Sequence, residues 1–394
     1  MSTVTRIALP DGSGFGASHL PYGVFSPPSA PPRVGVRFGD HVVDLAAALH
    51  DATFSAPSLN PFLALGPVRW AEVRERVTEL VAGDVPDDAV HRLADVTLHL
   101  PTEVADYVDF YASLHHATNV GRIFRPNGEP LTPNWKRLPI GYHGRAGTVV
   151  VSGTDVVRPR GLRVEAGASE PTYGPSLRLD FESELGFVVG VGSTHGEPVP
   201  VGAFAEHVFG VVLLDDWSAR DIQAFESVPL GPFLGKSFAT SIAAWVTPLA
   251  ALAAARLPLP AQEPTPAAYL RPADPWALDL DLEVAWNGDV VSRPHFRDMW
   301  WSADQMLAHT TVNGASLRTG DLYGSGTVSG PERDQRGCLL ELTWGGAEPL
   351  AVGGEERLFL QDGDTLTVTA SAPDTAGGRL SLGEVTGRIA PARG

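Results

Sequence analysis

The segment RLDFESELGFVVG, residues 178–190, places Glu182 and Glu184 two positions apart within an apolar run. Alternate side chains of a β-strand point to opposite faces, so residues two apart share a face with Cα atoms about 6.5 Å apart. The segment therefore predicts a strand that enters the core with both carboxylates on one face. The spacing leaves two interpretations open: an exposed polar face, or a site where a divalent cation neutralises the repulsion between the carboxylates.

Strand-like runs of the same kind dominate the chain after Pro101 and include GTVVVSG, HVFGVVLLDDW, LDLDLEVAWNGDVV, GCLLELTW and DTLTVTAS. Helical patterns are short, and strands do not alternate with long helices, which disfavours a parallel doubly wound sheet. The 42 glycines and 34 prolines are typical of a β-rich chain with long loops. We therefore predict a mostly β, α+β fold.

The chain is predicted to divide near Pro101 into an N-terminal unit, residues 1–100, and a larger unit, residues 101–394. A length of 394 residues favours one large domain with a smaller companion. In the N-terminal unit, RVGVRF and HVVDLA flank Gly39-Asp40, a hairpin signal. The segment VRWAEVRERVTELVAG, residues 68–83, follows with a helical stripe. We expect Val68, Val73, Val77, Leu80 and Val81 to form its buried face.

Composition and charge narrow the class of protein. A hydrophobic content of 43% with 19% charged residues is typical of a globular chain. The net charge of −17 argues against a nucleic-acid partner, because phosphate binding needs a basic face. The single cysteine, Cys338, excludes an intrachain disulfide and fits a reducing cytoplasm. With no apolar signal core or long apolar span, we expect a cytoplasmic protein without a membrane partner.

Two further acids strengthen the cation interpretation of the opening segment. The apolar run HVFGVVLLDDW ends at Asp216, and DYVDFY places Asp109 between aromatic residues. Carboxylates at the end of a buried strand serve either as site residues or as helix caps. If the four acids meet, their oxygens suit a hard cation such as Ca²⁺ or Mg²⁺. The spacing of cysteine and histidine does not fit a zinc site.

Other polar residues stand in settings compatible with catalysis. The histidine pair at 115–116 offers a general base near neutral pH, although an isolated histidine is more often structural. Arg220 and Gln223 lie on one face of a predicted short helix, which is either a donor face for a substrate or a solvated surface. Lys236, within an apolar Gly-rich stretch, is either a surface residue or a buried cation. Glu341 is expected on a strand, opposite the apolar face of CLLELTW.

Six longer motifs occur in a fixed order: DFYASLHHATNVGRIFR (109–125), LPIGYHGRAGTVVVSGT (138–154), LDFESELGFVVG (179–190), DDWSARDIQAFESVPLGPFLGKSFAT (215–240), GSGTVSGPE (324–332) and LLELTW (339–344). Together with LPYGVFS (20–26) and GVRFGDHVVDL (35–45), this set resembles the fumarylacetoacetate hydrolase family over nearly the whole chain. A single motif of this kind is weak evidence for a family, whereas six motifs in this order are highly specific for one.

The resemblance implies an architecture and a reaction. It implies a small N-terminal SH3-like barrel, residues 1–100, followed by a large mixed β-roll hydrolase domain, residues 101–394, in a homodimer. The implied reaction is metal-dependent hydrolysis of the carbon–carbon bond of 4-fumarylacetoacetate, a small diketo acid, to fumarate and acetoacetate. This is the last step of tyrosine and phenylalanine catabolism.

The resemblance also assigns roles by position. It implies His116 as the catalytic base, Glu341 as the acid that orients it, and Arg220, Gln223 and Lys236 as groups that stabilise the oxyanion. The implied substrate contacts are Tyr111, Arg125, Tyr142, Gln223 and Thr327. The implied Ca²⁺ ligands are Asp109, Glu182, Glu184 and Asp216, and a Mg²⁺ site falls on Asp216, Lys236 and Thr240. The chain has Ser227 where the family has a substrate-binding tyrosine, which predicts altered substrate fit rather than altered chemistry.

Two alternatives remain at this point. The same scaffold supports a hydrolase of a related diacylpyruvate or 1,3-diketo acid, or a decarboxylase or tautomerase of a β-keto acid. His116 together with Glu341 favours activation of water over simple enolisation. A non-catalytic Ca²⁺-stabilised binding protein is the second alternative, and it predicts an incomplete catalytic set.

Overall fold

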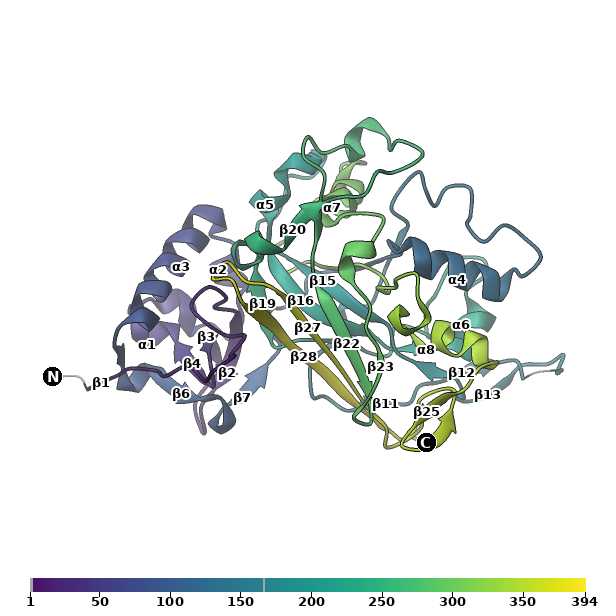
Figure 1. Cartoon of the computed structure of the whole chain (residues 1–394), viewed down its shortest axis with the longest axis horizontal. Helices are drawn as coiled ribbons and strands as arrows, with labels where there is room; N and C mark the ends of the chain where they lie inside the picture. Colours follow the sequence, from purple (N-terminus) through teal and green to yellow (C-terminus); the bar gives the residue numbers. More distant parts are fainter. Residues whose placement is uncertain (1–2, 166) are drawn as a thin grey trace.

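A 13-stranded sheet runs through the protein, for which a computed structural model describes residues 3–165 and 167–394 (Figure 1). Its strand path is β6-β4-β3-β2-β19-β16-β15-β24-β8-β9, with β7 beside β2, β18 beside β16, and β10 beside β18. The bounds are β2 (Tyr22–Ser26), β3 (Arg33–Phe38), β4 (His41–Asp44), β6 (Val90–Arg92), β7 (Thr97–His99), β8 (Tyr107–Phe110), β9 (Gly141–His143), β10 (Val149–Val151), β15 (Ser183–Val189), β16 (Val208–Asp216), β18 (Thr240–Ile242), β19 (Trp245–Pro248) and β24 (Leu322–Gly324).

The central strands β15 and β16 are buried along their whole length. Burial of every residue along a strand indicates that both of its faces are covered. A second, five-stranded sheet packs beside them, in the order β11-β28-β27-β22-β23. Its bounds are β11 (Val156–Val157), β22 (Asp281–Trp286), β23 (Asp289–Ser292), β27 (Thr365–Pro373) and β28 (Arg379–Ala390). Buried and half-buried residues alternate along β27, so this sheet has one face in the core.

Helices are short and lie at the periphery of the sheets (Figure 1). They are α1 (Leu45–Leu49), α2 (Asn60–Leu63), α3 (Gly66–Ala82), α4 (Leu114–Phe124), α5 (Phe204–His207), α6 (Arg220–Glu226), α7 (Ala303–Thr311) and α8 (Leu339–Leu342). Pairs of short strands complete the structure: β1 (Val4–Thr5) with β5 (Val85–Pro86), β12 (Arg160–Arg163) with β13 (Thr172–Pro175), β14 (Leu179–Asp180) with β17 (Ser218–Ala219), β20 (Arg256–Pro258) with β21 (Trp276–Leu278), and β25 (Leu350–Val352) with β26 (Glu355–Arg357). The architecture is mostly β with added helices, as predicted.

Helix α3 corrects one detail of the predicted apolar stripe. Val73, Val77 and Val81 are buried and Trp70 joins them, whereas the side chain of Val68 is 76% exposed. The helix begins at Gly66-Pro67, so Val68 lies in a first turn that faces solvent. The packed stripe therefore starts one turn later, at Trp70.

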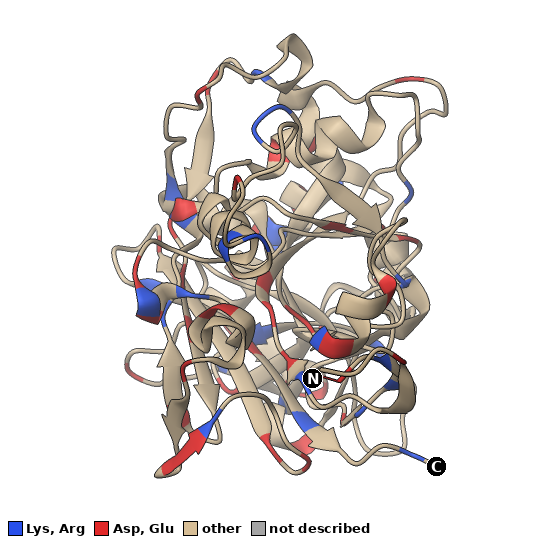
Figure 2. Cartoon of the chain, turned by 90° about the vertical axis from the view of Figure 1, so that its right-hand side faces the viewer, with Lys and Arg blue, Asp and Glu red and all other residues tan. Residues whose placement is uncertain are grey.

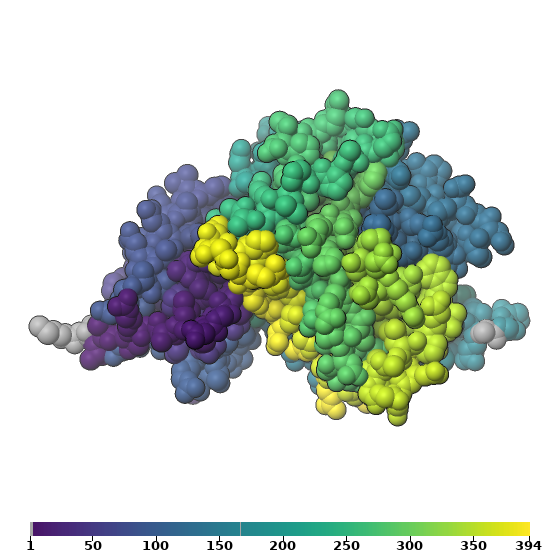
Figure 3. Space-filling view, in the orientation of Figure 1, coloured from purple at the N-terminus to yellow at the C-terminus, as the bar shows by residue number. Residues whose placement is uncertain are grey.

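The sheet is continuous between the N-terminal residues and the rest of the chain. Trp245 and Val246 of β19 pair with Gly23 and Tyr22 of β2. The C-terminal strand β28 also reaches this region, because Ser381 N donates to the carbonyl of Gly14 over 3.0 Å. Figure 3 shows the yellow C-terminal segment lying against the purple N-terminal residues. Among the described residues, none of the sheets closes into a barrel through its strand pairings. The SH3-like barrel therefore stays a prediction.

The segment CLLELTW is a second correction, because it is helical rather than extended. Residues Leu339–Leu342 form α8, one turn in which all four side chains are buried. Two of its backbone N–H groups, those of Leu339 and Leu340, donate to the carboxylate of Asp180. A contact distant in sequence therefore stabilises a helical turn where local propensity suggested a strand.

Charged residues are spread over many elements. Figure 2 shows acidic and basic residues interspersed along strands and loops in that view. Within the part of the chain that the structure describes, none of the helices combines the length and apolar composition needed to cross a membrane.

Candidate active site

Strand register brings the four predicted cation ligands together. Glu182 directly precedes β15, Glu184 is its second residue, and Asp216 is the last residue of β16. Strand β24 lies between β15 and β8, pairing Gly324 with Gly186 on one side and with Asp109 on the other. One carboxylate oxygen from each acid lies within 4.8 Å of the others, and all four side chains are buried.

Two buried oxygen atoms of this acid cluster, Asp109 Oδ1 and Glu184 Oε1, accept no hydrogen bond from the part of the chain that the structure describes. Glu184 Oε2 accepts one from Gly326 N over 2.9 Å. Gly326 has φ of +75°, and a Cβ there would lie 2.2 Å from the Phe110 carbonyl, so only glycine suits this approach. Unpartnered buried oxygens among several carboxylates fit a hard divalent cation.

Two buried cations cover the other side of the cluster. Lys236 Nζ donates to Glu182 Oε2 and to Asp216 Oδ2, each over 2.6 Å. Arg220 Nη1 lies 2.7 Å from Glu182 Oε1, and its Nη2 is buried without a partner. Thr240 Oγ1 donates to Asp216 Oδ1 over 3.0 Å. Four acids therefore face two cations, and a bound divalent cation would balance the remaining charge.

The charges divide the cluster into two kinds of carboxyl group. Burial raises the pKa of Glu182, but Lys236 and Arg220 outweigh it and hold that pKa below its usual range. Burial, reinforced by the Asp216 charge, raises the pKa of Asp109 well above its usual range. Burial and the neighbouring Asp109 likewise raise the pKa of Glu184. The surroundings thus favour the ionised form of Glu182, whereas an added positive charge would favour the ionised forms of Asp109 and Glu184.

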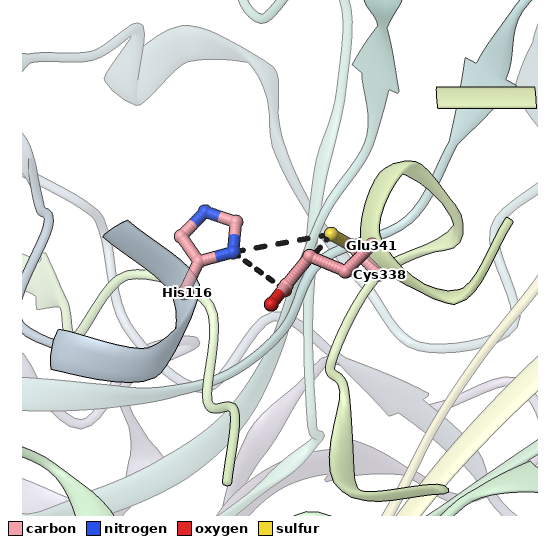
Figure 4. Close-up of side chains that lie close together, drawn as sticks. All are labelled: His116, Cys338 and Glu341. Atoms are coloured by element: carbon pink, nitrogen blue, oxygen red, sulfur yellow. Dashed lines mark hydrogen bonds and ion pairs between the residues drawn. The ribbon is translucent and has the colours of Figure 1, made fainter. Parts of the chain in front are cut away.

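His116 and Glu341 form a buried dyad (Figure 4), and Cys338 next to it forms a β-bridge with Glu182 of the acid cluster. Ser113 begins α4 and its Oγ accepts from His116 N over 3.2 Å, which places the imidazole on the first turn. His116 Nδ1 lies 2.6 Å from Glu341 Oε2. Because a carboxylate only accepts, Nδ1 carries the proton and Nε2 is left with a free lone pair. This is the arrangement of a general base.

Glu341 is held by donors that the sequence analysis did not identify. Asn119 Nδ2 donates to Oε1 over 2.9 Å, and Ser329 Oγ donates to Oε2 over 2.7 Å. Cys338 Sγ also donates to Oε2, over 3.3 Å. Burial raises the pKa of Glu341, but His116 and these donors outweigh it and lower that pKa below its usual value. Figure 4 shows the side chains of His116, Cys338 and Glu341 close together, with Glu341 as the common acceptor of the other two.

One of these missed residues carried a sequence signal. Asn119 stands three positions after His116, so both side chains lie on one face of α4. Ser329 and Asp180 carried no comparable signal. Asp180 Oδ2 accepts from Arg220 Nε over 2.7 Å while Asp180 also binds the first N–H groups of α8, so it links Arg220 to the turn that carries Glu341.

Most of the predicted substrate contacts surround the dyad and the acids. The ring of Tyr111 meets the His116 ring edge-on, with centroids 5.2 Å apart. Tyr142 of β9 pairs with Asp109 of β8. Thr327 Oγ1 is buried without a partner, and Gln223 Oε1 accepts from Arg220 Nη1 over 3.2 Å.

Arg125 is the predicted contact that the structure does not bring into this cluster. It is exposed at the end of α4 and donates to the carbonyls of Glu129 and Pro130. Ser227 ends α6, where its Oγ donates to the carbonyl of Gln223 over 2.5 Å. The small serine side chain places no aromatic ring at this position.

A cavity of about 110 Å³ opens beside the acid cluster. Asp216, Lys236 and Thr240 line it together with Tyr107 and Tyr142. The cavity therefore reaches the acid cluster at Asp216.

Comparison with known proteins covers nearly the whole chain. The family model described as Fumarylacetoacetate (FAA) hydrolase C-terminal matches residues 106–390, and Fumarylacetoacetase N-terminal matches residues 18–101. The fumarylacetoacetase of Arabidopsis thaliana is 45% identical over 406 residues, covering 96% of each chain. That of Caenorhabditis elegans is 45% identical over 413 residues, 98% of this chain and 99% of the relative, and that of Homo sapiens is 43% identical over 413 residues, 98% of each.

Solved structures share the fold at lower sequence identity. A fumarylacetoacetate hydrolase from Exiguobacterium antarcticum matches with a TM-score of 0.58 and 18% identity, covering 95% of this chain and 100% of that one. A maleylpyruvate hydrolase from Sphingobium sp. SYK-6, in complex with manganese(II) ion and pyruvate, matches with a TM-score of 0.56 and 16% identity over the same shares.

Proposed function

The chain belongs to the fumarylacetoacetate hydrolase family, and from that premise we propose that it hydrolyses 4-fumarylacetoacetate to fumarate and acetoacetate. The observation that carries the proposal is a His116–Glu341 dyad beside a buried acid cluster. This combination occurs in a chain aligned end to end with fumarylacetoacetases. The reaction completes tyrosine and phenylalanine catabolism.

The cation requirement follows from the acid cluster, for which we propose Ca²⁺ held by Asp109, Glu182, Glu184 and Asp216. A bound cation would withdraw electron density from a 1,3-diketone and stabilise an enolate leaving group. The proposed Mg²⁺ site has oxygens from Asp216 and Thr240. Lys236 is its cationic neighbour and not a ligand, because an ammonium group has no lone pair.

His116 and Glu341 prepare the water for attack. Nε2 of His116 takes a proton from a water molecule, while Glu341 holds Nδ1 and stabilises the resulting imidazolium. The hydroxide adds to the substrate carbonyl that adjoins the bond to be cleaved. When that carbon–carbon bond breaks, its electron pair leaves with the acetoacetate enolate, which takes the proton back from His116.

Arg220, Gln223 and Lys236 are proposed to stabilise the negative charge that develops on the attacked carbonyl oxygen. Arg220 Nη2 supports this assignment, because it is a buried donor with no protein partner. Lys236 already binds two carboxylates, so its contribution is a fixed positive field. Gln223 accepts from Arg220, which leaves its amide N–H groups for the substrate.

Substrate positioning is proposed to involve Tyr111, Tyr142, Thr327, Gln223 and Arg125. The unpartnered Thr327 Oγ1 and the ring of Tyr111 against His116 support their assignment. Arg125 uses Nε and Nη2 in its bonds to the carbonyls of Glu129 and Pro130, which leaves N–H groups of its guanidinium for a carboxylate.

Ser227, in place of the family tyrosine, favours related 1,3-diketo acids as additional substrates. The half-buried serine donates to its own helix and presents little surface to a substrate. A panel of diacylpyruvates, followed by loss of diketone ultraviolet absorbance, tests this second candidate. Turnover of fumarylacetoacetate alone would exclude it.

We propose further that the chain divides into residues 1–100, an SH3-like barrel, and residues 101–394, a β-roll hydrolase domain. The separate family matches to residues 18–101 and 106–390 support this division. A homodimer in the cytoplasm completes the proposal. Light scattering of the purified protein and fractionation of cells would test these two points.

The central experiment measures the hydrolysis of fumarylacetoacetate by purified protein with Ca²⁺ or Mg²⁺, and after chelation. We expect turnover that falls on chelation and returns with the cation. His116→Ala should fold and bind the cation but lose at least about 10²-fold in turnover, the lower bound for a general base. Near-normal turnover of that variant would contradict the role of His116.

A further inference from the structure

Tyr107 lies next to the acid cluster, although none of the steps above uses it. It is the first residue of β8, two positions before Asp109, so both side chains leave the strand on the same face. Its ring packs over Gly144, where a Cβ would lie 2.4 Å from a ring carbon. Tyr107 is only 2% exposed, and its buried hydroxyl has no hydrogen-bond partner among the described residues.

The Tyr107 hydroxyl and one oxygen each of Asp109 and Glu184 lie near the same point. A Cβ on Gly324 would lie 3.3 Å from Tyr107 OH, 3.3 Å from Asp109 Oδ1 and 2.8 Å from Glu184 Oε2. Because Gly324 has no side chain, the space beside its Cα is bordered by three oxygens, which belong to residues of β8 and β15. Tyr107 also lines the cavity of about 110 Å³ shared with Asp216 and Lys236.

Three buried polar groups without partners, close together, are uncommon in folded proteins. They are Tyr107 OH, Asp109 Oδ1 and Glu184 Oε1. Native structures keep such groups mainly where a ligand, ion or water satisfies them. The carboxylate oxygens are acceptors, whereas a phenol is protonated at neutral pH and is also a donor. A cation alone satisfies the acceptors but leaves the Tyr107 hydroxyl without a partner.

We propose that Tyr107 is a positioning residue of the cation site: its hydroxyl donates a hydrogen bond to an oxygen of the cation's immediate surroundings, a carboxylate or a bound water. This inference rests on the cation site proposed above and adds a neutral donor to it. Donation from Tyr107 holds that oxygen toward the ion and strengthens Ca²⁺ binding. Its effect therefore exists only in the cation-loaded protein.

The test compares Tyr107→Phe with wild-type protein and with Tyr22→Phe, a matched control. Tyr22 in β2 is also a buried tyrosine whose hydroxyl has no partner, and it lies outside the acid cluster. Ca²⁺ alone is titrated by calorimetry into chelator-stripped protein, and melting temperatures are measured with and without Ca²⁺. Hydrolysis of fumarylacetoacetate is assayed separately, so the failure of the proposed reaction is distinguished from the failure of this inference.

Tyr107→Phe is expected to weaken Ca²⁺ binding about 3- to 10-fold, the range of one hydrogen bond, and to reduce the rise in melting temperature on Ca²⁺ binding. Without Ca²⁺ it should melt no lower than wild type, because the lost hydroxyl has no partner there. Tyr22→Phe should bind Ca²⁺ as wild type does. Equal Ca²⁺ affinity in Tyr107→Phe and wild type overturns the inference, as does a wild-type protein that binds no Ca²⁺.

Discussion

Replacing Glu341 by glutamine tests the central claim that a charged acceptor activates His116. Glutamine keeps the shape of the side chain but removes the charge and turns one acceptor atom into a donor. In the wild-type protein, Glu341 Oε2 accepts from three donors and Glu341 Oε1 from one, Asn119. The side-chain oxygen of the new glutamine should therefore face His116, and its NH₂ group should face Asn119. The dyad then keeps its geometry but loses its charge-assisted bond.

The magnitude follows from the bond that is lost. A hydrogen bond to a charged group contributes about 1.5–3 kcal/mol. If the imidazolium of His116 loses this stabilisation in the transition state, kcat falls about 10- to 150-fold, because about 1.36 kcal/mol corresponds to a tenfold change in rate. KM should stay near its wild-type value, because four protein donors already occupy the two carboxylate oxygens of Glu341.

The assay is steady-state hydrolysis of fumarylacetoacetate with saturating cation, accompanied by circular dichroism to confirm folding. Asn119→Ala is the matched control, since it removes one donor from Glu341 but keeps the charge, and it should reduce kcat less than Glu341→Gln does. A Glu341→Gln variant within about twofold of wild type would refute the reasoning, given that general-base catalysis typically contributes about 10²–10⁴-fold. Equal losses in the two variants would show that orientation matters and charge does not.

Three further predictions concern the acid cluster. Since burial raises the pKa of Asp109 and Glu184, these two groups bind more protons in the native cation-free protein than in the unfolded chain above about pH 4, and their contribution to stability falls as pH rises from there. The rise in melting temperature on Ca²⁺ binding should therefore be larger at neutral than at mildly acidic pH; an equal rise at both pH values would contradict this. Glu184→Gln should weaken Ca²⁺ binding at least about tenfold, measured by calorimetry, because it removes a ligand charge. The control, Ser183→Ala, should bind Ca²⁺ nearly as wild type does, because the Ser183 hydroxyl donates to the Gly337 carbonyl. Equal losses in the two variants would mean that the strand register is misassigned. Gly324→Ala places a methyl group 2.8 Å from Glu184 Oε2 and should also weaken Ca²⁺ binding, and an unchanged affinity would show that this point lies outside the cation site.

Much of the site was visible as a set of candidates in the sequence. The period-2 spacing of Glu182 and Glu184 placed both carboxylates on one strand face, because strand geometry is local. Motif order identified the family, and full-length relatives confirm that assignment. The spacing of three residues between His116 and Asn119 also predicts that both side chains lie on one helix face.

Other features depended on contacts between distant segments. His116 and Glu341 are 225 positions apart, and no local pattern shows that α4 and α8 meet. The segment CLLELTW looked extended by its residue pattern, but the Asp180 carboxylate binds its backbone N–H groups as a helical turn. Arg125 was expected at the substrate, yet nearby carbonyls hold its guanidinium.

The sequence by itself therefore determined which chemical groups the protein carries and which neighbours share a strand face. Only the tertiary structure decided which of those groups are close enough to interact. The physical reason is that periodicity reports geometry over a few residues, whereas a buried charge acquires its properties from everything packed around it. Glu182 and Glu184 illustrate this: they share a strand and a side-chain type, but Lys236 and Arg220 lower the pKa of the first while burial raises that of the second.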